Sequence, residues 1–116
     1  MTIEQLRNLC LSFPHATEDV KWGNDLCFSI GGKMFCVTGL EEPLSASFKV
    51  RQEEFEEMCQ REHIVPAPYV ARYHWVLVQQ PDALSGQGWE DFVKQSYELV
   101  RAALPKKVRE GLGQGH

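Results

Sequence analysis

Two adjacent glycines, Gly31 and Gly32, separate two mainly apolar runs, and they limit the possible folds more than any other feature. Glycine readily adopts the positive φ angles that a two-residue hairpin turn requires. The flanking runs, residues 26–30 and 33–38, have the length and apolar content of strands. We therefore expect a β-hairpin with its turn at the two glycines.

Counting back from the turn predicts the register of this hairpin. With Ile30 opposite Lys33, Cys27 faces Cys36. The other opposed pairs are Leu26 with Val37 and Phe28 with Phe35. Side chains alternate between the two sides of a strand. One face then carries Leu26, Phe28, Ile30, Phe35 and Val37, and the other carries Cys27, Ser29, Met34, Cys36 and Thr38. We expect the first face to lie in the core and the second, semi-polar face to be open.

Residues 64–78 form a second ordered segment that combines two prolines with three aromatic residues. Each proline fixes its own φ and biases the preceding residue toward extended geometry, so residues 64–70 are expected to cross the molecule in an extended form. Residues 75–78 are apolar and predict a buried strand. The side chains of the segment either pack against the edge of the core or form a recognition surface. That surface would contain Tyr69, Arg72, His74 and Trp75.

Apolar spacing and end signals predict three helices, over residues 3–12, 52–60 and 89–104. Thr2 and Gln5 form a capping box before the first helix. A third strand is expected over 45–50. The polar stretch 15–25 predicts a loop in which Val20 and Trp22 lie against the core, and 79–88 predicts another loop.

The resulting order is α-β-β-β-α-β-α. Hairpin connections and alternating faces indicate an α+β fold in two layers, with a mainly antiparallel sheet and helices on one face. With 116 residues the chain has room for one domain. We expect that domain to cover 1–105, followed by a flexible C-terminal tail over 106–116.

The composition narrows the class of protein. Apolar content of 43% and charged content of 24% are ordinary for a globular domain. No apolar run approaches the roughly 20 residues of a membrane span, and the acidic N-terminal segment lacks the basic start of a signal peptide. We expect a cytoplasmic protein with no membrane association. Its four cysteines form no CxxC pair and are expected to be reduced.

Four short motifs occur in an order and spacing that resemble the MmcQ/YjbR family. They are Gly-Gly-Lys-Met-Phe at 31–35, Pro-Ala-Pro-Tyr at 66–69, His-Trp-Val at 74–76 and Ser-Tyr-Glu-Leu-Val at 96–100. The resemblance covers roughly residues 3–105. It implies a small domain related in fold to frataxin-like (CyaY-like) and secretion-chaperone-like domains. It also implies DNA binding through a double-wing surface, a role suggested for this largely uncharacterised family on fold grounds.

Two binding hypotheses follow. A DNA-binding surface would use the hairpin tip and the loop at 39–44 as wings, with basic contacts from Lys33, Lys49, Arg51 and Arg72. Glu41 and Glu42 in the second wing would repel phosphate, and the net charge of −4 disfavours nonspecific nucleic-acid binding. The alternative is a protein-interaction module that uses the open sheet face, with Tyr69, His74 and Trp75 at the interface.

The sequence predicts neither a catalytic site nor a metal site. Cys27, Cys36 and His74 together supply too few ligands for a four-ligand metal site. The acidic residues of 53–57 are expected to be solvated rather than to bind iron. The four histidines are accompanied by no nucleophile motif or phosphate loop. We therefore expect no catalytic residue, no metal and no cofactor, and a monomer or weak dimer that acts by binding.

Overall fold

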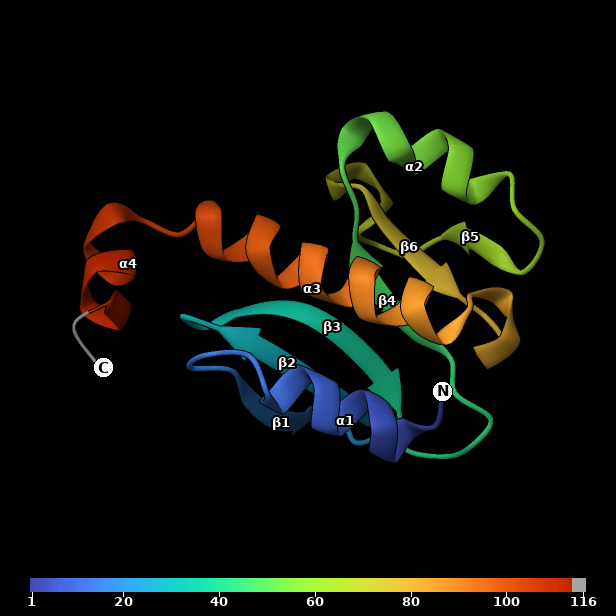
Figure 1. Ribbon diagram of the computed structural model, residues 1–116, viewed down its shortest axis with the longest axis horizontal. Helices are drawn as coiled ribbons and strands as arrows, with labels where there is room; N and C mark the ends of the chain where they lie inside the picture. The colour runs from blue at the N-terminus through green and yellow to red at the C-terminus, as the bar shows by residue number, and fades with distance from the viewer. Residues whose placement is uncertain (114–116) are drawn as a thin grey trace.

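The computed structural model describes residues 1–113 and forms one six-stranded sheet with four α-helices (Figure 1). The elements are α1 (Ile3–Leu11), β1 (Thr17–Lys21), β2 (Asp25–Ile30), β3 (Lys33–Gly39), β4 (Ala46–Lys49), α2 (Gln52–Cys59), β5 (Ile64–Pro66), η1 (Ala71–Tyr73), β6 (Trp75–Val78), η2 (Pro81–Ala83), α3 (Gly86–Ala102) and α4 (Lys106–Gly113). The strand order is β1-β2-β3-β4-β6-β5, and every neighbouring pair is antiparallel. The α+β fold class is confirmed.

Capping residues decide where two of the helices begin. The Thr2 hydroxyl accepts a hydrogen bond from the Gln5 N–H at 3.1 Å, and the Gln5 side chain accepts from the Thr2 N–H at 2.9 Å, as the capping box predicts. Helix α3 begins at Gly86, three residues earlier than expected, because the Ser85 hydroxyl accepts from the Gly88 N–H at 3.0 Å. A serine cap outweighs the low helix propensity of the glycines that follow it.

The structure adds two edge strands that the sequence pattern did not reveal. Strand β1 lies in the range 15–25, which we expected to be loop, and it pairs with β2. Its sequence Thr-Glu-Asp-Val-Lys has no apolar alternation, because an edge strand with exposed side chains needs none. Val20 and Trp22 are exposed, so their expected position against the core is wrong. Strand β5 covers the first three residues of the extended 64–70 segment.

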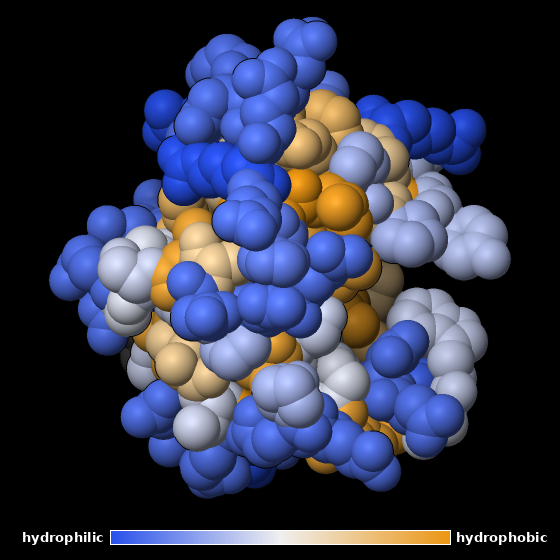
Figure 2. Space-filling model, turned by 90° about the vertical axis from the view of Figure 1, so that its right-hand side faces the viewer, coloured by the Kyte–Doolittle hydropathy of each residue, from blue (hydrophilic) through white to orange (hydrophobic). Residues whose placement is uncertain are grey.

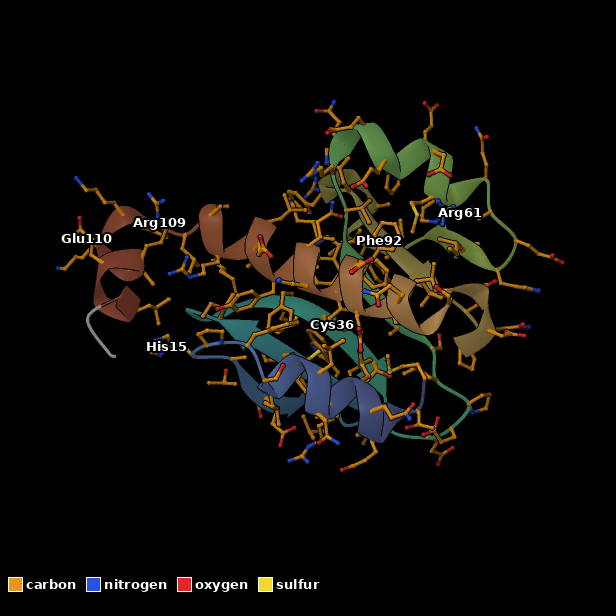
Figure 3. All side chains as sticks on the ribbon, in the orientation of Figure 1. His15, Cys36, Arg61, Phe92, Arg109 and Glu110 are labelled. Atoms are coloured by element: carbon orange, nitrogen blue, oxygen red, sulfur yellow. The ribbon has the colours of Figure 1, made fainter. Side chains whose placement is uncertain are left out.

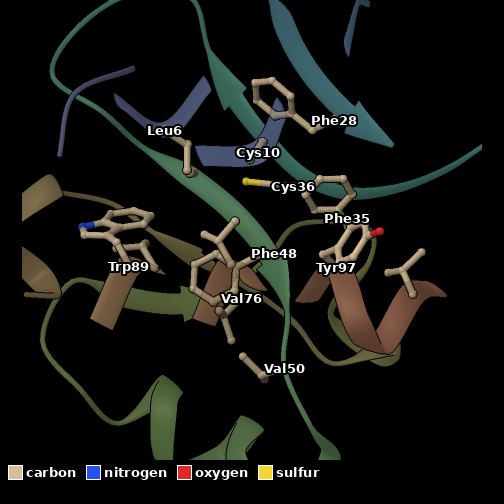
Figure 4. Packing of buried hydrophobic residues seen from close by; sticks show 14 of the residues in the cluster. Leu6, Cys10, Phe28, Phe35, Cys36, Phe48, Val50, Val76, Trp89 and Tyr97 are labelled. Carbon is tan, nitrogen blue, oxygen red and sulfur yellow. The ribbon is translucent and has the colours of Figure 1, made fainter. Parts of the chain in front are cut away.

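The core lies between one face of the sheet and helices α1, α2 and α3 (Figure 4). Phe28, Phe35 and Phe48 are fully buried, as the pattern predicts. The Phe48 ring meets the Trp89 ring edge to face, with centroids 6.2 Å apart, and the Phe35 ring meets the Tyr97 ring at 5.3 Å. The Arg61 guanidinium lies over the Phe92 ring at 5.9 Å and links the end of α2 to α3 (Figure 3).

A β-bulge in β3 shifts the predicted hairpin register by one residue. Ile30 pairs with Lys33 as expected, but Phe28 pairs with Cys36 and Cys27 with Val37, so Phe35 has no direct partner in β2. The expected pairs of Cys27 with Cys36, Phe28 with Phe35 and Leu26 with Val37 are therefore wrong. Cys36 turns into the core against Cys10 of α1 (Figure 4). Val37 takes its place on the open face.

The carbonyl of the bulged residue, Phe35, is bonded by a helix side chain rather than by a neighbouring strand. The buried Ser96 hydroxyl of α3 donates to that carbonyl at 2.6 Å and accepts from the Lys49 N–H of β4 at 2.9 Å. One hydroxyl therefore stands between β3 and β4 where a direct ladder bond would otherwise form. This hydroxyl satisfies both the Phe35 carbonyl and the Lys49 N–H, and it fixes α3 to the sheet at this point.

The C-terminal region differs from the expected tail. Residues 106–113 form helix α4 after Pro105, which starts a new helix more readily than it continues an old one. A γ-methyl group of Val108 and the δ-methyl groups of Leu104 lie against Gly31 at the hairpin tip. The last residues of the predicted tail, 114–116, lie outside the described residues.

Candidate binding site on the open face of the sheet

The face of the sheet that points away from the helices carries a cleft of about 650 Å³. Its floor is formed by four adjacent strands, β2, β3, β4 and β6, which span about 14 Å at roughly 4.8 Å per strand spacing. Its lining is mainly apolar and consists of Trp22, Asp25, Met34, Val37, Ser47, Ala67, Pro68, Tyr69, Val70 and Trp75. Seen edge-on, the molecule has a notch with apolar surface inside it (Figure 2). This size and lining are typical of ligand clefts.

Two aromatic side chains stand at the rims of the cleft. Trp22 in the β1–β2 turn is 70% exposed, and Tyr69 in the loop after β5 is 98% exposed. Both have positive φ angles, 56° and 68°. A bulky residue in this left-handed region costs about 1–2 kcal/mol, and neither side chain recovers that cost by burial. Unrelieved strain of this kind points to functional positions.

The proline-containing loop is held to the sheet at its base. The buried Ala67 donates its N–H to the Trp75 carbonyl at 3.0 Å. Pro66 before it pairs with Val76 of β6, and Pro68 after it leads directly into Tyr69. The two prolines restrict the backbone on both sides of this anchor. The Tyr69 side chain is therefore presented from a fixed support rather than from a free loop.

The structure brings two of the three predicted interaction residues to the cleft. Trp75 is 8% exposed and forms part of its wall, while Tyr69 stands at its rim. His74 is not in the lining; its imidazole packs edge to face on Phe55 of α2, with centroids 5.8 Å apart. Trp22 was missed as a site residue because it was expected to be tucked against the core. The sequence feature that could have revealed Trp22 as a site residue is its position directly before the turn-forming Gly23 and Asn24, because a turn is exposed at the surface.

The predicted basic residues divide between two places. Lys49, Arg51 and Arg72 lie near the junction of β4 with α2, where the Val50 N–H bonds the His74 carbonyl at 2.9 Å. Lys33 is the first residue of β3 at the hairpin tip, and Figure 1 shows the β2–β3 hairpin extending away from the junction of β4 with α2. Two of the cations have local partners. The Lys49 ammonium donates to the Tyr73 carbonyl at 3.0 Å, and the Arg72 guanidinium lies over the Tyr73 ring at 4.9 Å.

The acidic residues of the second predicted wing have a structural contact. The Glu42 carboxylate accepts a hydrogen bond from the Ile3 N–H at 2.8 Å, at the start of α1. A carboxylate at a helix N-terminus is favoured by the exposed N–H groups and the helix dipole. This contact links the loop between β3 and β4 to the helix layer. It gives Glu42, one of the two acidic residues of the loop, a structural role.

The thiols of Cys10, Cys27 and Cys59 are in environments that suppress their reactivity. Burial raises the pKa of the Cys10 thiol strongly, and contact with Cys36 raises it further. Burial also raises the pKa of Cys27 and of Cys59. A raised pKa lowers the thiolate fraction that attacks electrophiles and binds soft metals. Within residues 1–113, no group of three or more His, Cys, Asp or Glu side chains could hold a metal ion.

No helix within the described part of the chain is long and apolar enough to span a bilayer.

Fold and site together define a small α+β domain with one helix-covered sheet face and one face that carries an aromatic-rimmed cleft. A sequence model of the YjbR family matches residues 11–99, and the chain belongs to that family.

Two solved structures resemble the fold. The Deinococcus radiodurans protein DR2400, described with a DUF419 domain, is 29% identical with a TM-score of 0.87, and the match covers 97% of this chain and 88% of that one. A Pseudomonas syringae protein is 17% identical with a TM-score of 0.70, over 86% of this chain and 99% of that one, a likeness of fold alone. A search of curated proteins found no match.

Proposed function

We propose that this protein is a protein-interaction module that binds its partner through the cleft on the open sheet face and performs no chemistry itself. The observation that supports this best is the pair of exposed, backbone-strained aromatics, Trp22 and Tyr69, on opposite rims of one apolar cleft. Aromatic residues are enriched at interface hot spots because they bury a large area at a low entropy cost. We expect this module to act in the cytoplasm as a monomer or weak dimer.

Photo-crosslinking in cells tests this function. A photoreactive phenylalanine analogue placed at position 22 or 69 should give the same discrete protein adduct from both positions. The control position is Glu90, which is exposed on α3 in the opposite layer. The proposal fails if positions 22 and 69 give no adduct, or only the adducts that position 90 also gives.

A matched pair of variants sharpens the result. With the photoreactive residue at position 22, Tyr69→Ala should weaken the adduct, because it removes a rim of the cleft. Tyr73→Ala should leave it unchanged, because Tyr73 is a half-exposed tyrosine four residues away that does not line the cleft. Equal loss in both variants would mean that the region, and not the cleft, is responsible.

DNA binding is the second candidate, favoured by the grouping of Lys49, Arg51 and Arg72 at one corner of the molecule. Three phosphate contacts predict that log K falls with log salt at a slope of about −3. A mobility-shift assay with a duplex at low salt, repeated at increasing salt, measures this slope. Arg51→Gln with Arg72→Gln should flatten it, whereas Lys106→Gln with Lys107→Gln should not. No shift at low salt would end this candidate.

A further inference from the structure

Asp25 is the charged residue of the cleft lining, and it sets the sign of the charge that the cleft accepts. Its carboxylate takes part in none of the ion pairs formed within residues 1–113. Lys21 is its partner across the β1–β2 ladder but is not part of the lining. The Lys49 ammonium on β4 is directed to the Tyr73 carbonyl instead. The cleft therefore has one carboxylate and no lining cation.

The aromatic side chains of the lining also favour a cation. Trp22 lies three residues before Asp25 in the same β1–β2 hairpin, and Tyr69 and Trp75 line the cleft on the side of β5 and β6. The face of an aromatic ring attracts a cation, most strongly in tryptophan. The remaining apolar lining, which includes Met34 and Val37, suits an aliphatic stem. An apolar body that ends in a positive charge is complementary to both parts of the cleft.

The exposure of the rim indicates the size of the partner. Tyr69 is almost wholly exposed, so a small molecule contained in the cleft would leave most of its ring in water. A protein segment that crosses the rim would cover it. A nucleic acid is disfavoured here because its phosphates would meet the Asp25 carboxylate, and the chain carries a net charge of −4.

We infer that the cleft accepts an arginine side chain presented by the protein partner, with its stem on Met34 and Val37 and its guanidinium between the Trp22 ring and Asp25. Arginine fits better than lysine because its planar head stacks on aromatic faces and pairs with a carboxylate through two hydrogen bonds. This inference rests on the proposed protein-binding function and names the chemistry of the partner.

Blocked pentapeptides provide the test. The first, Gly-Leu-Arg-Leu-Gly, is compared with the same peptide carrying citrulline, a neutral isostere, and with one carrying glutamate. Binding is followed by nuclear magnetic resonance, using the indole N–H of Trp22 as the reporter. We expect the arginine peptide to bind about two- to thirtyfold more tightly than the citrulline peptide, the range of a cation–aromatic contact. The glutamate peptide should bind more weakly than either.

Variants assign the charge effect to Asp25. Asp25→Asn should narrow the difference between the arginine and citrulline peptides by weakening arginine binding, and the part that remains is the contact with the aromatic ring. Lys21→Ala should strengthen arginine binding, because it removes the nearest cation on the neighbouring strand. Tyr73→Ala should change neither affinity. The resonances of the core residues report whether each variant is folded.

Each other outcome separates this inference from the proposed function. Equal affinity for the arginine and citrulline peptides, or no binding of either while positions 22 and 69 still crosslink to one protein, overturns the inference alone. Loss of both binding and crosslinks overturns both. Tighter binding of benzylguanidinium than of the peptide would assign the cleft to a small cation. A dimer in sedimentation that Trp22→Ala dissolves would assign it to a second copy of the chain.

Discussion

The two faces of the sheet use aromatic side chains in opposite ways. On the helix side, Phe28 and Phe48 are fully buried, and the Phe48 ring meets other aromatic rings of α3. On the open side, Trp22 and Tyr69 are exposed and held at positive φ. The buried rings contribute to the stability of the fold, whereas the exposed rings cost backbone energy that the isolated chain does not recover. The difference teaches that the aromatic rings on the helix side stabilise the fold, whereas those on the open side do not and are left for the binding that we propose.

The largest expected effect comes from truncating one aromatic on each face. Phe48→Ala should lower the free energy of unfolding by about 3–5 kcal/mol, because it opens a cavity beneath α3. Tyr69→Ala should change it by less than about 0.5 kcal/mol, the usual limit for exposed positions. Urea denaturation measures both values. Comparable losses from the two variants would remove the distinction between the faces.

The second effect concerns the hydroxyl that joins α3 to the sheet. Ser96→Ala should lower the free energy of unfolding by about 2–4 kcal/mol, because the Phe35 carbonyl and the Lys49 N–H each lose a buried partner. Ser47→Ala, in the cleft lining of β4, is the matched control and should have little effect. Hydrogen exchange of the Lys49 amide should accelerate in the first variant only. An unchanged exchange rate would contradict the bridging role.

The third effect tests the strain on the open face. Tyr69→Asn should raise the free energy of unfolding by up to about 1 kcal/mol over Tyr69→Ala, because asparagine tolerates the left-handed conformation that costs other residues about 1–2 kcal/mol. Thermal denaturation of the two variants measures the difference. If alanine proves as stable as asparagine, Tyr69 is not strained in solution.

The smallest effect comes from the ion pair that joins α1 to the helix side of β1. The Arg7 guanidinium donates two hydrogen bonds of 2.7 Å to Glu18 and holds the pKa of that carboxyl below its usual value. Its contribution is therefore present above the unfolded pKa of about 4.3 and is lost as pH falls through the lower folded pKa. The stability difference between the native chain and Glu18→Gln should shrink on acidification. A difference that stays constant with pH would contradict this assignment.

Much of the fold could be predicted because local rules and tertiary packing agree there. The α1 capping box, the turn at Gly31 and Gly32 and the apolar 75–78 strand all follow from neighbouring residues. The bulge at Phe35 could not be predicted, since no neighbouring residue signals it and the Phe35 carbonyl is bonded by a serine 61 positions away in the chain. Strand β1 was missed because an exposed edge needs no apolar alternation.

The candidate site was predicted only in part, for a related reason. Tyr69 and Trp75 were found because they lie close together in one proline-stiffened segment. Trp22 reaches the same cleft from another part of the chain, through the position of β1 at the edge of the sheet. The role proposed for Asp25 depends on its being the charged residue of the cleft lining. No motif signals this, because it follows from how the strands and loops assemble around the cleft.

The Ser96 hydroxyl has a mechanical consequence. Because it bonds both the Phe35 carbonyl and the Lys49 N–H, it extends the link between β3 and β4 beyond their last ladder pair, Cys36 with Phe48. The next pair along the same strands, Val37 with Ser47, lies in the cleft lining. A helix on the covered face of the sheet therefore helps to hold together the two central strands of the cleft floor.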